Sequence, residues 1–243
     1  MRSGAQVDIN FNHFLQNLVA VVIINSSQST TVTANTFDID EAAPVIDYAA
    51  GIVLSVTKAD APPNTRLVIH NNKFNLSDSA DLPLDAISVA VFDGPYQTVS
   101  LAVTNNTFNL FGENIAGVWG VDIDNGAVSA NLFNGFGWSA VTVLAENLLT
   151  ISDWTITANK GLLNFTANKA DIEIGYDVLQ TIVGPQNATV SDLGTGSSLL
   201  SVEPGDSNTM QTDLGNKTEK SFADRQRAVA GSHAKLMQFL KRN

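Results

Sequence analysis

The sequence predicts an all-β chain that coils into a stack of parallel strands. Two observations carry this prediction: a six-residue phrase recurs along the chain, and strand-like segments without a helical period lie between its copies. The chain has 243 residues, 44% of them hydrophobic, which is enough to bury a sizeable core. It contains no cysteine, which excludes a disulfide scaffold, a zinc ribbon and thiol catalysis.

The recurring phrase is an aliphatic residue, two variable positions, asparagine, one variable position and phenylalanine. The sixth copy keeps the asparagine but has Gly161 in place of phenylalanine. Successive asparagines are 23, 37, 34, 25 and 28 residues apart, so each unit is one irregular coil. The copies contain Asn12, Asn35, Asn72, Asn106, Asn131 and Asn159, with phenylalanine at 14, 37, 74, 108 and 133 and an aliphatic residue at 9, 32, 69, 103, 128 and 156.

Stacked coils would place equivalent asparagines about 4.8 Å apart, the spacing between neighbouring strands. Each side-chain amide can then donate to the next coil and accept from the previous one, which satisfies a polar group inside a tight turn. The sequence therefore predicts a ladder of the six asparagines. The phenylalanines and the aliphatic residues form two further columns inside the coil.

A second strand lies between the copies. Alternating, β-branched residues mark it at 52–56, 87–91, 119–123 and 141–143, whereas Leu18 to Ile24 is too uniformly apolar to fix a register. The absence of a helical period or a regular leucine scaffold excludes helical solenoids and leucine-rich repeats. An antiparallel sandwich is disfavoured, because it would not require asparagine at one position of every unit.

In the phrases Val-x-x-Asn-x-Phe and Asn-Asn-Thr-Phe, residues 5–195 resemble the right-handed parallel β-helix family, the pectate-lyase-like superfold. The resemblance implies a right-handed solenoid of about six to seven coils. It does not specify a function, because such coils host polysaccharide lyases and hydrolases, epimerases, phage tailspikes and surface adhesins. The Asp-Asp, Gly-His-Gly and Arg-x-Lys phrases of the polygalacturonase branch do not occur, so the resemblance supplies no catalytic residue.

The chain divides into a β-helix over 1–195, a linker over 196–217 and a basic amphipathic α-helix over 218–243. Gly, Ser, Asn and Asp dominate the linker. Ser221 and Asp224 form a capping box, and one helix face carries Phe222, Val229, Leu236 and Leu240. Three interpretations of this helix remain open: an end cap docked on the acidic body, a contact with a partner helix or another subunit, and a contact with an anionic membrane.

Charge is unevenly distributed. Residues 1–217 carry a net charge of −15, and residues 218–243 carry +4. An acidic body argues against nucleic acid as a partner, because phosphate binding needs clustered Lys and Arg. No apolar stretch is long enough for a transmembrane segment. The first coil begins almost at Met1, so we expect either a longer natural chain or a cover over that open coil, by self-association or by a partner.

Carboxylates are the only catalytic candidates. Asp122 and Asp124 are expected to alternate outward from a strand that buries Val121 and Ile123, and the next coil should bring Glu146 beside Asp124. Three neighbouring carboxylates could hold Ca²⁺ or place an acid and a base across a sugar. The alternative is an ordinary solvated strand, and no metal ligand set can be assigned.

A second acidic group lies in two long insertions, residues 38–49 and 75–86. They follow the same phenylalanine in adjacent coils, so we expect them to project side by side as loops. Carboxylates beside an aromatic ring would suit calcium or a glycan, whereas the alternative is ordinary solvated loops. The candidate binding residues are Asp38, Asp40, Glu41, Asp47, Tyr48, Asp78, Asp81 and Asp85.

Together these features favour a non-catalytic β-helix that is extracellular or exposed at the cell surface. It would make carbohydrate or protein contacts through its side faces and acidic loops, as an adhesin or structural protein does. Six N-glycosylation sequons, beginning at residues 25, 75, 105, 164, 187 and 216, are compatible with a glycoprotein. The alternative is a polysaccharide lyase or glycoside hydrolase that acts on the outer sheet face and could depend on Ca²⁺.

Overall fold

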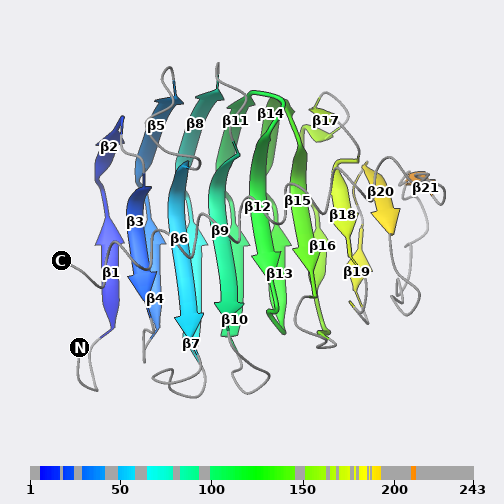
Figure 1. Cartoon of the computed structure of the whole chain (residues 1–243), viewed down its shortest axis with the longest axis horizontal. Coiled ribbons are helices and arrows are strands. Elements are labelled where there is room, and N and C mark those ends of the chain that lie inside the picture. Colours follow the sequence, from blue (N-terminus) through cyan, green and yellow to red (C-terminus); the bar gives the residue numbers. More distant parts are fainter. Residues whose placement is uncertain are drawn as a thin grey trace.

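The computed structural model of the chain is a stack of coils, and the strands of successive coils lie side by side along its long axis (Figure 1). No helix long and apolar enough to cross a membrane occurs among the described residues. The described residues are 6–16, 19–24, 29–41, 49–57, 65–78, 83–92, 99–145, 151–162, 165–167, 170–175, 178, 181–184, 186, 188–192 and 209–211.

The strands form three sheets, and every strand pair is parallel, so the predicted parallel stacking is confirmed. The seven-stranded sheet has the order β1 (Val7–Asn10), β4 (Thr30–Thr33), β7 (Thr65–His70), β10 (Val99–Thr104), β13 (Gly126–Ser129), β16 (Thr155–Thr157) and β19 (Ile182–Val183). The six-stranded sheet has the order β2 (His13–Leu15), β5 (Thr36–Glu41), β8 (Lys73–Asp78), β11 (Thr107–Phe111), β14 (Leu132–Gly137) and β17 (Thr166–Ala167).

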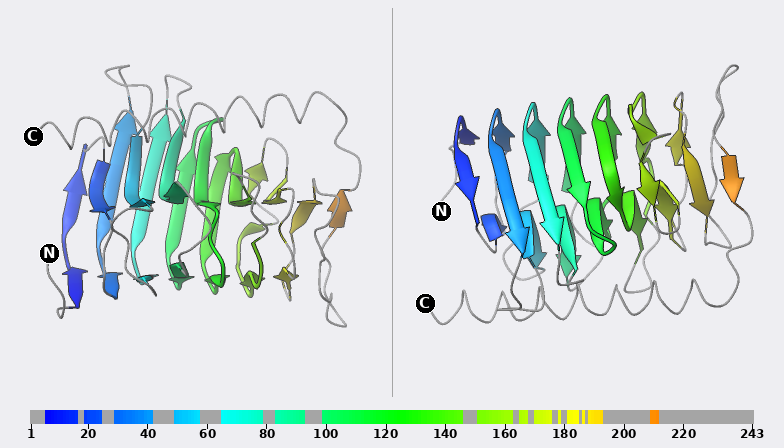
Figure 2. Two further views of the ribbon diagram at one scale, coloured as in Figure 1. Left: turned by 60° about the horizontal axis from the view of Figure 1, so that its bottom comes forward. Right: turned by 90° about the horizontal axis from the view of Figure 1, so that it is seen from above.

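The eight-stranded sheet has the order β3 (Val19–Ile24), β6 (Ala49–Thr57), β9 (Leu84–Phe92), β12 (Ile115–Val121), β15 (Ser139–Leu144), β18 (Ile172–Ile174), β20 (Thr189–Asp192) and β21 (Thr209–Gln211). Each of the first five coils passes through the seven-stranded, the six-stranded and the eight-stranded sheet in turn (Figure 2). This arrangement fits a parallel β-helix.

The turn from the seven-stranded to the six-stranded sheet has two residues in each of these coils. The first residue adopts a left-handed backbone with φ between 54° and 56°, and the second is the recurrent asparagine. The left-handed residue is Phe11, Ala34, Asn71, Asn105 or Ala130, and Ala158 repeats the geometry in the sixth coil. Non-glycine residues adopt this conformation at a cost of about 1–2 kcal/mol, so other interactions must hold the corner in place.

Side-chain amides of the recurrent asparagines hold this corner in place. The Oδ1 atom of Asn106 accepts from both the backbone N–H and the Nδ2 of Asn72, at 2.9 and 3.0 Å. The Nδ2 of Asn106 donates to the Ile69 carbonyl at 3.0 Å and to Asn131 Oδ1 at 3.1 Å. The same bonds link Asn12, Asn35, Asn72, Asn131 and Asn159 to their neighbours.

A seventh amide that the sequence analysis missed completes this ladder. Gln186 Oε1 accepts from the backbone N–H and Nδ2 of Asn159 at 3.0 and 2.9 Å, and its Nε2 donates to the Ile156 carbonyl. Val183 pairs with Ile156, so Val183-x-x-Gln186 is a further copy of the phrase with glutamine in place of asparagine.

The phenylalanine column fills the core beside the ladder. Phe14, Phe37, Phe74, Phe108 and Phe133 stack with ring centroids 4.7–5.0 Å apart and ring planes within 11° of parallel. In the sixth coil, where glycine replaces the phenylalanine, Phe165 meets Phe133 edge-on at 6.4 Å. Contacts between aromatic rings add to the burial energy of the rings.

The middle strands β9, β12 and β15 of the eight-stranded sheet are buried on both faces. The inward residues of the sheet join the central core, and a second cluster lies on its outer face, formed by Ala50, Val53, Ala90, Ala116, Trp119, Val121, Trp138 and Leu144. In strand β3 the side chains of Val21 and Ile23 join the core, whereas Val22 between them is only partly buried. The predicted basic helix over 218–243, and most of the linker over 196–217, lie outside the described residues.

Replacing Asn106 with alanine removes one rung of the ladder: the backbone N–H of Asn72 loses its acceptor, the Ile69 carbonyl loses the donor on the Asn106 side chain, and Asn72 Nδ2 and Asn131 Oδ1 each lose one of their bonds. Because an unsatisfied buried polar group costs about 1–3 kcal/mol, we expect Asn106→Ala to lower the free energy of unfolding by at least about 3 kcal/mol in chemical denaturation. Asn105→Ala is the matched control, since Asn105 is the adjacent, exposed residue of the same turn. Equal losses in the two variants would contradict a stabilising role of the ladder.

Candidate functional site

The outer face of the six-stranded sheet carries three rows of side chains, one from each outward position of the strands. The middle row joins Leu15, Asp38, Asn75, Asn109 and Asn134 in register across five coils. One flanking row contains His13, Thr36, Lys73, Thr107 and Leu132, and the other contains Asp40, Ser77, Phe111, Phe136 and Thr166.

Hydrogen bonds connect the four polar side chains of the middle row, from Asn134 to Asp38. Asn134 Nδ2 donates to Asn109 Oδ1 at 2.9 Å, and Asn109 Nδ2 donates to Asn75 Oδ1 at 2.7 Å. Asn75 Nδ2 in turn donates to Asp38 Oδ1. The direction of donation along this row is therefore toward the first coil, and the row ends on a carboxylate that only accepts.

The amides of this row keep part of their hydrogen-bonding capacity. A primary amide offers two N–H donors and two lone pairs, and Asn109 uses one donor and one lone pair within the row. Because the side chain is only partly buried, the remaining donor and acceptor are available to a ligand on the outer surface.

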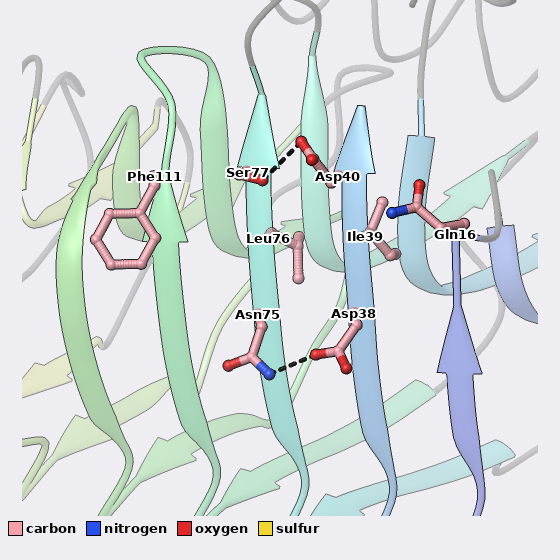
Figure 3. Close-up of a pocket in the computed structure, with 8 residues that line it drawn as sticks. All are labelled: Gln16, Asp38, Ile39, Asp40, Asn75, Leu76, Ser77 and Phe111. Atoms are coloured by element: carbon pink, nitrogen blue, oxygen red, sulfur yellow. Dashed lines mark hydrogen bonds between the residues drawn. The ribbon is translucent and has the colours of Figure 1, made fainter. Parts of the chain in front are cut away.

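A shallow, open pocket of about 210 Å³ lies over this face between β2 and β11. Figure 3 shows Asp40 and Ser77 joined at one side of it and Asp38 and Asn75 joined below them. The Ser77 hydroxyl donates to Asp40 Oδ1 at 2.8 Å. The lining residues are Gln16, Asp38, Ile39, Asp40, Asn75, Leu76, Ser77 and Phe111.

Two exposed aromatic rings border the polar rows. Phe111 and Phe136 are 49% and 42% exposed, and their rings meet edge-on with centroids 6.2 Å apart. An exposed aromatic pair beside convergent polar groups is the usual composition of a small-molecule site, in which apolar surface supplies contact area and the polar groups fix orientation.

Asp38 carries the charge at the end of the middle row. Its Oδ2 lies 2.6 Å from His13 Nε2, and its side chain is 32% exposed. The hydrogen bond from Asn75 is the main cause that lowers the pKa of Asp38; burial opposes it, and His13 and Lys73 add smaller lowering contributions. The site therefore keeps a carboxylate at its edge even in mildly acidic solution.

Parts of the two acidic insertions are strands, although we expected loops over their whole length. Asp38 and Asp40 lie on strand β5, and Asp78 ends strand β8. The alternation of buried Phe37 and Ile39 with these acids keeps the segment in the sheet. Asp47, Tyr48, Asp81 and the side chain of Glu41 lie outside the described residues, so the proximity of the full set stays a prediction.

Asp85 is in a different place from the rest of that group. It pairs with Ala50 and Ala116 on the eight-stranded sheet and is fully buried. The expectation that it projects from a loop beside Asp38 is therefore wrong, because Leu84 to Phe92 continues as strand β9.

Asp122 and Asp124 do not alternate outward from one strand. Strand β12 ends at Val121, and Asp122 follows it with a left-handed backbone and only 6% exposure. Asp124 lies in the same turn, where its Oδ1 accepts from the Ser152 N–H at 2.9 Å. Both carboxylates thus belong to a turn, and Glu146 lies outside the described residues.

The row of asparagines was missed by the sequence analysis, although a signal for it exists. The residue after the recurrent phenylalanine is Asp38, Asn75, Asn109 or Asn134, which extends the phrase to Asn-x-Phe-Asn/Asp. An outward amide at one position of successive parallel strands predicts a second ladder on the solvent side. The exposed rings of Phe111 and Phe136 follow two residues later at paired positions.

No group of three or more His, Asp or Glu side chains in the described part of the chain is arranged to hold a metal ion. The Ca²⁺ hypothesis rests on residues that include Glu146, Asp47 and Asp81 and stays a prediction. Comparison of the chain with protein-family models, with curated proteins and with solved structures finds no match.

The lowered pKa of Asp38 predicts how acid acts on this site. Because the folded-state pKa lies below that of the unfolded chain, the carboxylate stabilises the fold above the unfolded pKa of about 4. That contribution is lost as the pH falls from there through the lowered pKa. A carboxyl-carbon NMR titration should give Asp38 a pKa below 3.8 in the wild type and a higher one in Asn75→Ala.

Asn134→Ala is the matched control for that titration, since Asn134 belongs to the same row and does not contact Asp38. It should leave the Asp38 titration unchanged. A pKa of Asp38 that is equal in the wild type and in Asn75→Ala would show that the row does not act on the carboxylate.

Proposed function

We propose that this protein is a non-catalytic, surface-exposed β-helix that binds carbohydrate through the outer face of its six-stranded sheet. The observation that carries the proposal is the hydrogen-bonded row of Asp38, Asn75, Asn109 and Asn134 beside the exposed Phe111 and Phe136. Each group in it suits a sugar, whose hydroxyls both donate and accept and whose ring faces carry C–H groups that pack on aromatic rings.

The spacing of the row favours a chain of sugars over a single one. The rows follow the stack axis, and neighbouring strands are about 4.8 Å apart, which is close to the length of one hexose unit. An extended polysaccharide lying along the axis would therefore meet an equivalent amide at each coil. The acidic end at Asp38 and Asp40 disfavours polyanionic chains, so we propose a neutral polysaccharide as the ligand.

We further propose that the solenoid is right-handed, as parallel crossover connections almost always are, and that it functions outside the cell or at its surface. The three parallel sheets and the ladder support the first statement. The low content of charged residues and the Thr-, Ser- and Asn-rich outer strands support the second. In this role the protein resembles adhesins and structural solenoids more than enzymes.

Glycan-array screening followed by affinity electrophoresis in neutral polysaccharides tests the proposal. The double variant Asn109→Ala, Phe111→Ala should weaken binding at least tenfold, because it removes an amide and an aromatic contact from the centre of the face; tenfold corresponds to about 1.4 kcal/mol. The double variant Thr104→Ala, Ser129→Ala is the control, since both residues lie partly exposed on the seven-stranded sheet.

Two outcomes would overturn the proposal. Binding that survives in the Asn109→Ala, Phe111→Ala variant would place the ligand elsewhere, and the absence of binding to any neutral glycan would exclude the ligand class. Reducing ends and unsaturated products are followed in the same incubations, with and without Ca²⁺. Turnover that disappears in Asp122→Ala or Glu146→Ala would identify a polysaccharide lyase or glycoside hydrolase instead.

A further inference from the structure

The outer face of the eight-stranded sheet has an apolar surface that is removed from water. Val53, Trp119 and Val121 point away from the central core and belong to the second hydrophobic cluster, yet they are only 1–5% exposed. Trp138 at its edge is 5% exposed. A single sheet cannot bury its own outer face, so another part of the chain must cover these side chains.

The same face holds two carboxylates out of water. Asp85 and Glu173 are fully buried. Glu173 Oε2 accepts from Trp138 Nε1 at 2.7 Å and from Thr142 Oγ1 at 3.2 Å. Carboxylates in such a place require hydrogen bonds and nearby positive charge to offset the loss of hydration. Whatever covers the face should therefore be apolar on one side and carry cations.

Few segments outside the described residues can meet these requirements. The connections 42–48, 58–64, 79–82, 93–98 and 146–150 each have seven residues or fewer and lie in different coils, so none of them alone can span a face of eight strands. Residues 193–208 contain no Lys or Arg. Residues 218–243 have the apolar positions Phe222, Val229, Leu236 and Leu240 at helical spacing and six basic residues.

We propose that residues 218–243 form a helix that lies along the stack axis across the outer face of the eight-stranded sheet. A helix over 221–242 would be about 33 Å long at 1.5 Å per residue, and eight strands about 4.8 Å apart span about 34 Å. The net charge of +4 in this segment complements the −15 of residues 1–217. The segment is thus a side wall of the solenoid, in place of an end cap or a membrane anchor.

The three tryptophans of the full-length chain provide the test. Trp119 and Trp138 lie on the covered face, whereas Trp154 is buried in the central core. In the wild type, acrylamide should reach none of the three tryptophans. In Val229→Asp, Leu236→Asp, two charges disrupt the apolar side of the helix, so acrylamide should quench Trp119 and Trp138. Trp154 should stay protected, which reports that the solenoid remains folded.

Gly231→Asp, Gln238→Asp is the matched control. It adds the same two charges with the same spacing of seven residues, on the opposite side of the helix. Its quenching should equal that of the wild type. Equal quenching of the wild type and Val229→Asp, Leu236→Asp would overturn the proposal.

Hydrogen exchange of the unmodified full-length protein supplies a second measurement that does not depend on a variant folding. Backbone amides of 222–240 should exchange at least tenfold more slowly than expected for an unstructured chain, at all protein concentrations. Exchange at the unstructured rate would overturn the proposal. So would protection that appears only with rising concentration, because a second copy of the chain would then be the cover.

Discussion

The rest of this structure depends on the buried amide at one corner of each coil. A left-handed residue begins the two-residue turn, and the following asparagine binds the backbone of the previous coil and the amide of the next. Because one side chain satisfies both main-chain and side-chain groups, the register between coils is fixed at that point. The strands on either side inherit this register, which aligns the stacked phenylalanines inside and the outward rows of the six-stranded sheet.

The two amide rows differ in direction and in environment. In the buried ladder, each Nδ2 donates to the following coil, and Gln186 receives the last bond. In the outer row, each Nδ2 donates to the preceding coil, and Asp38 receives the last bond. The buried row has its polar groups satisfied by the fold, whereas the outer row retains donors and acceptors in contact with solvent. The same residue type thus stabilises the coil at one position and offers a recognition surface at the other.

Much of the fold could be predicted from the sequence, because asparagine and phenylalanine recur at fixed positions within the phrase. Gln186 escaped because its amide is one carbon longer than the residue sought. Asp38 and Asp40 were assigned to a loop because they belong to a long insertion after the recurrent phenylalanine, although the buried Phe37 and Ile39 alternate with them in the period of a strand. The burial of the outer face around Trp119 could not be predicted from local alternation, because it requires contact with residues distant in sequence. Asp122 was expected on a strand because residues 121–124 alternate between apolar and acidic, but that strand ends at Val121.

Because the corner always has two residues, a coil can change in length without changing its position relative to its neighbours in the stack. Between the six-stranded and eight-stranded sheets, the connection varies from one residue to seven in the first five coils, while the corner with the asparagine does not vary. Insertions can therefore accumulate in one connection without moving the residues that face outward on the next coil. Duplication of a whole coil would lengthen every outer face by one strand spacing, about 4.8 Å, and leave the existing corners intact. A surface of this type can evolve toward longer ligands by repetition, with no redesign of the coils already present.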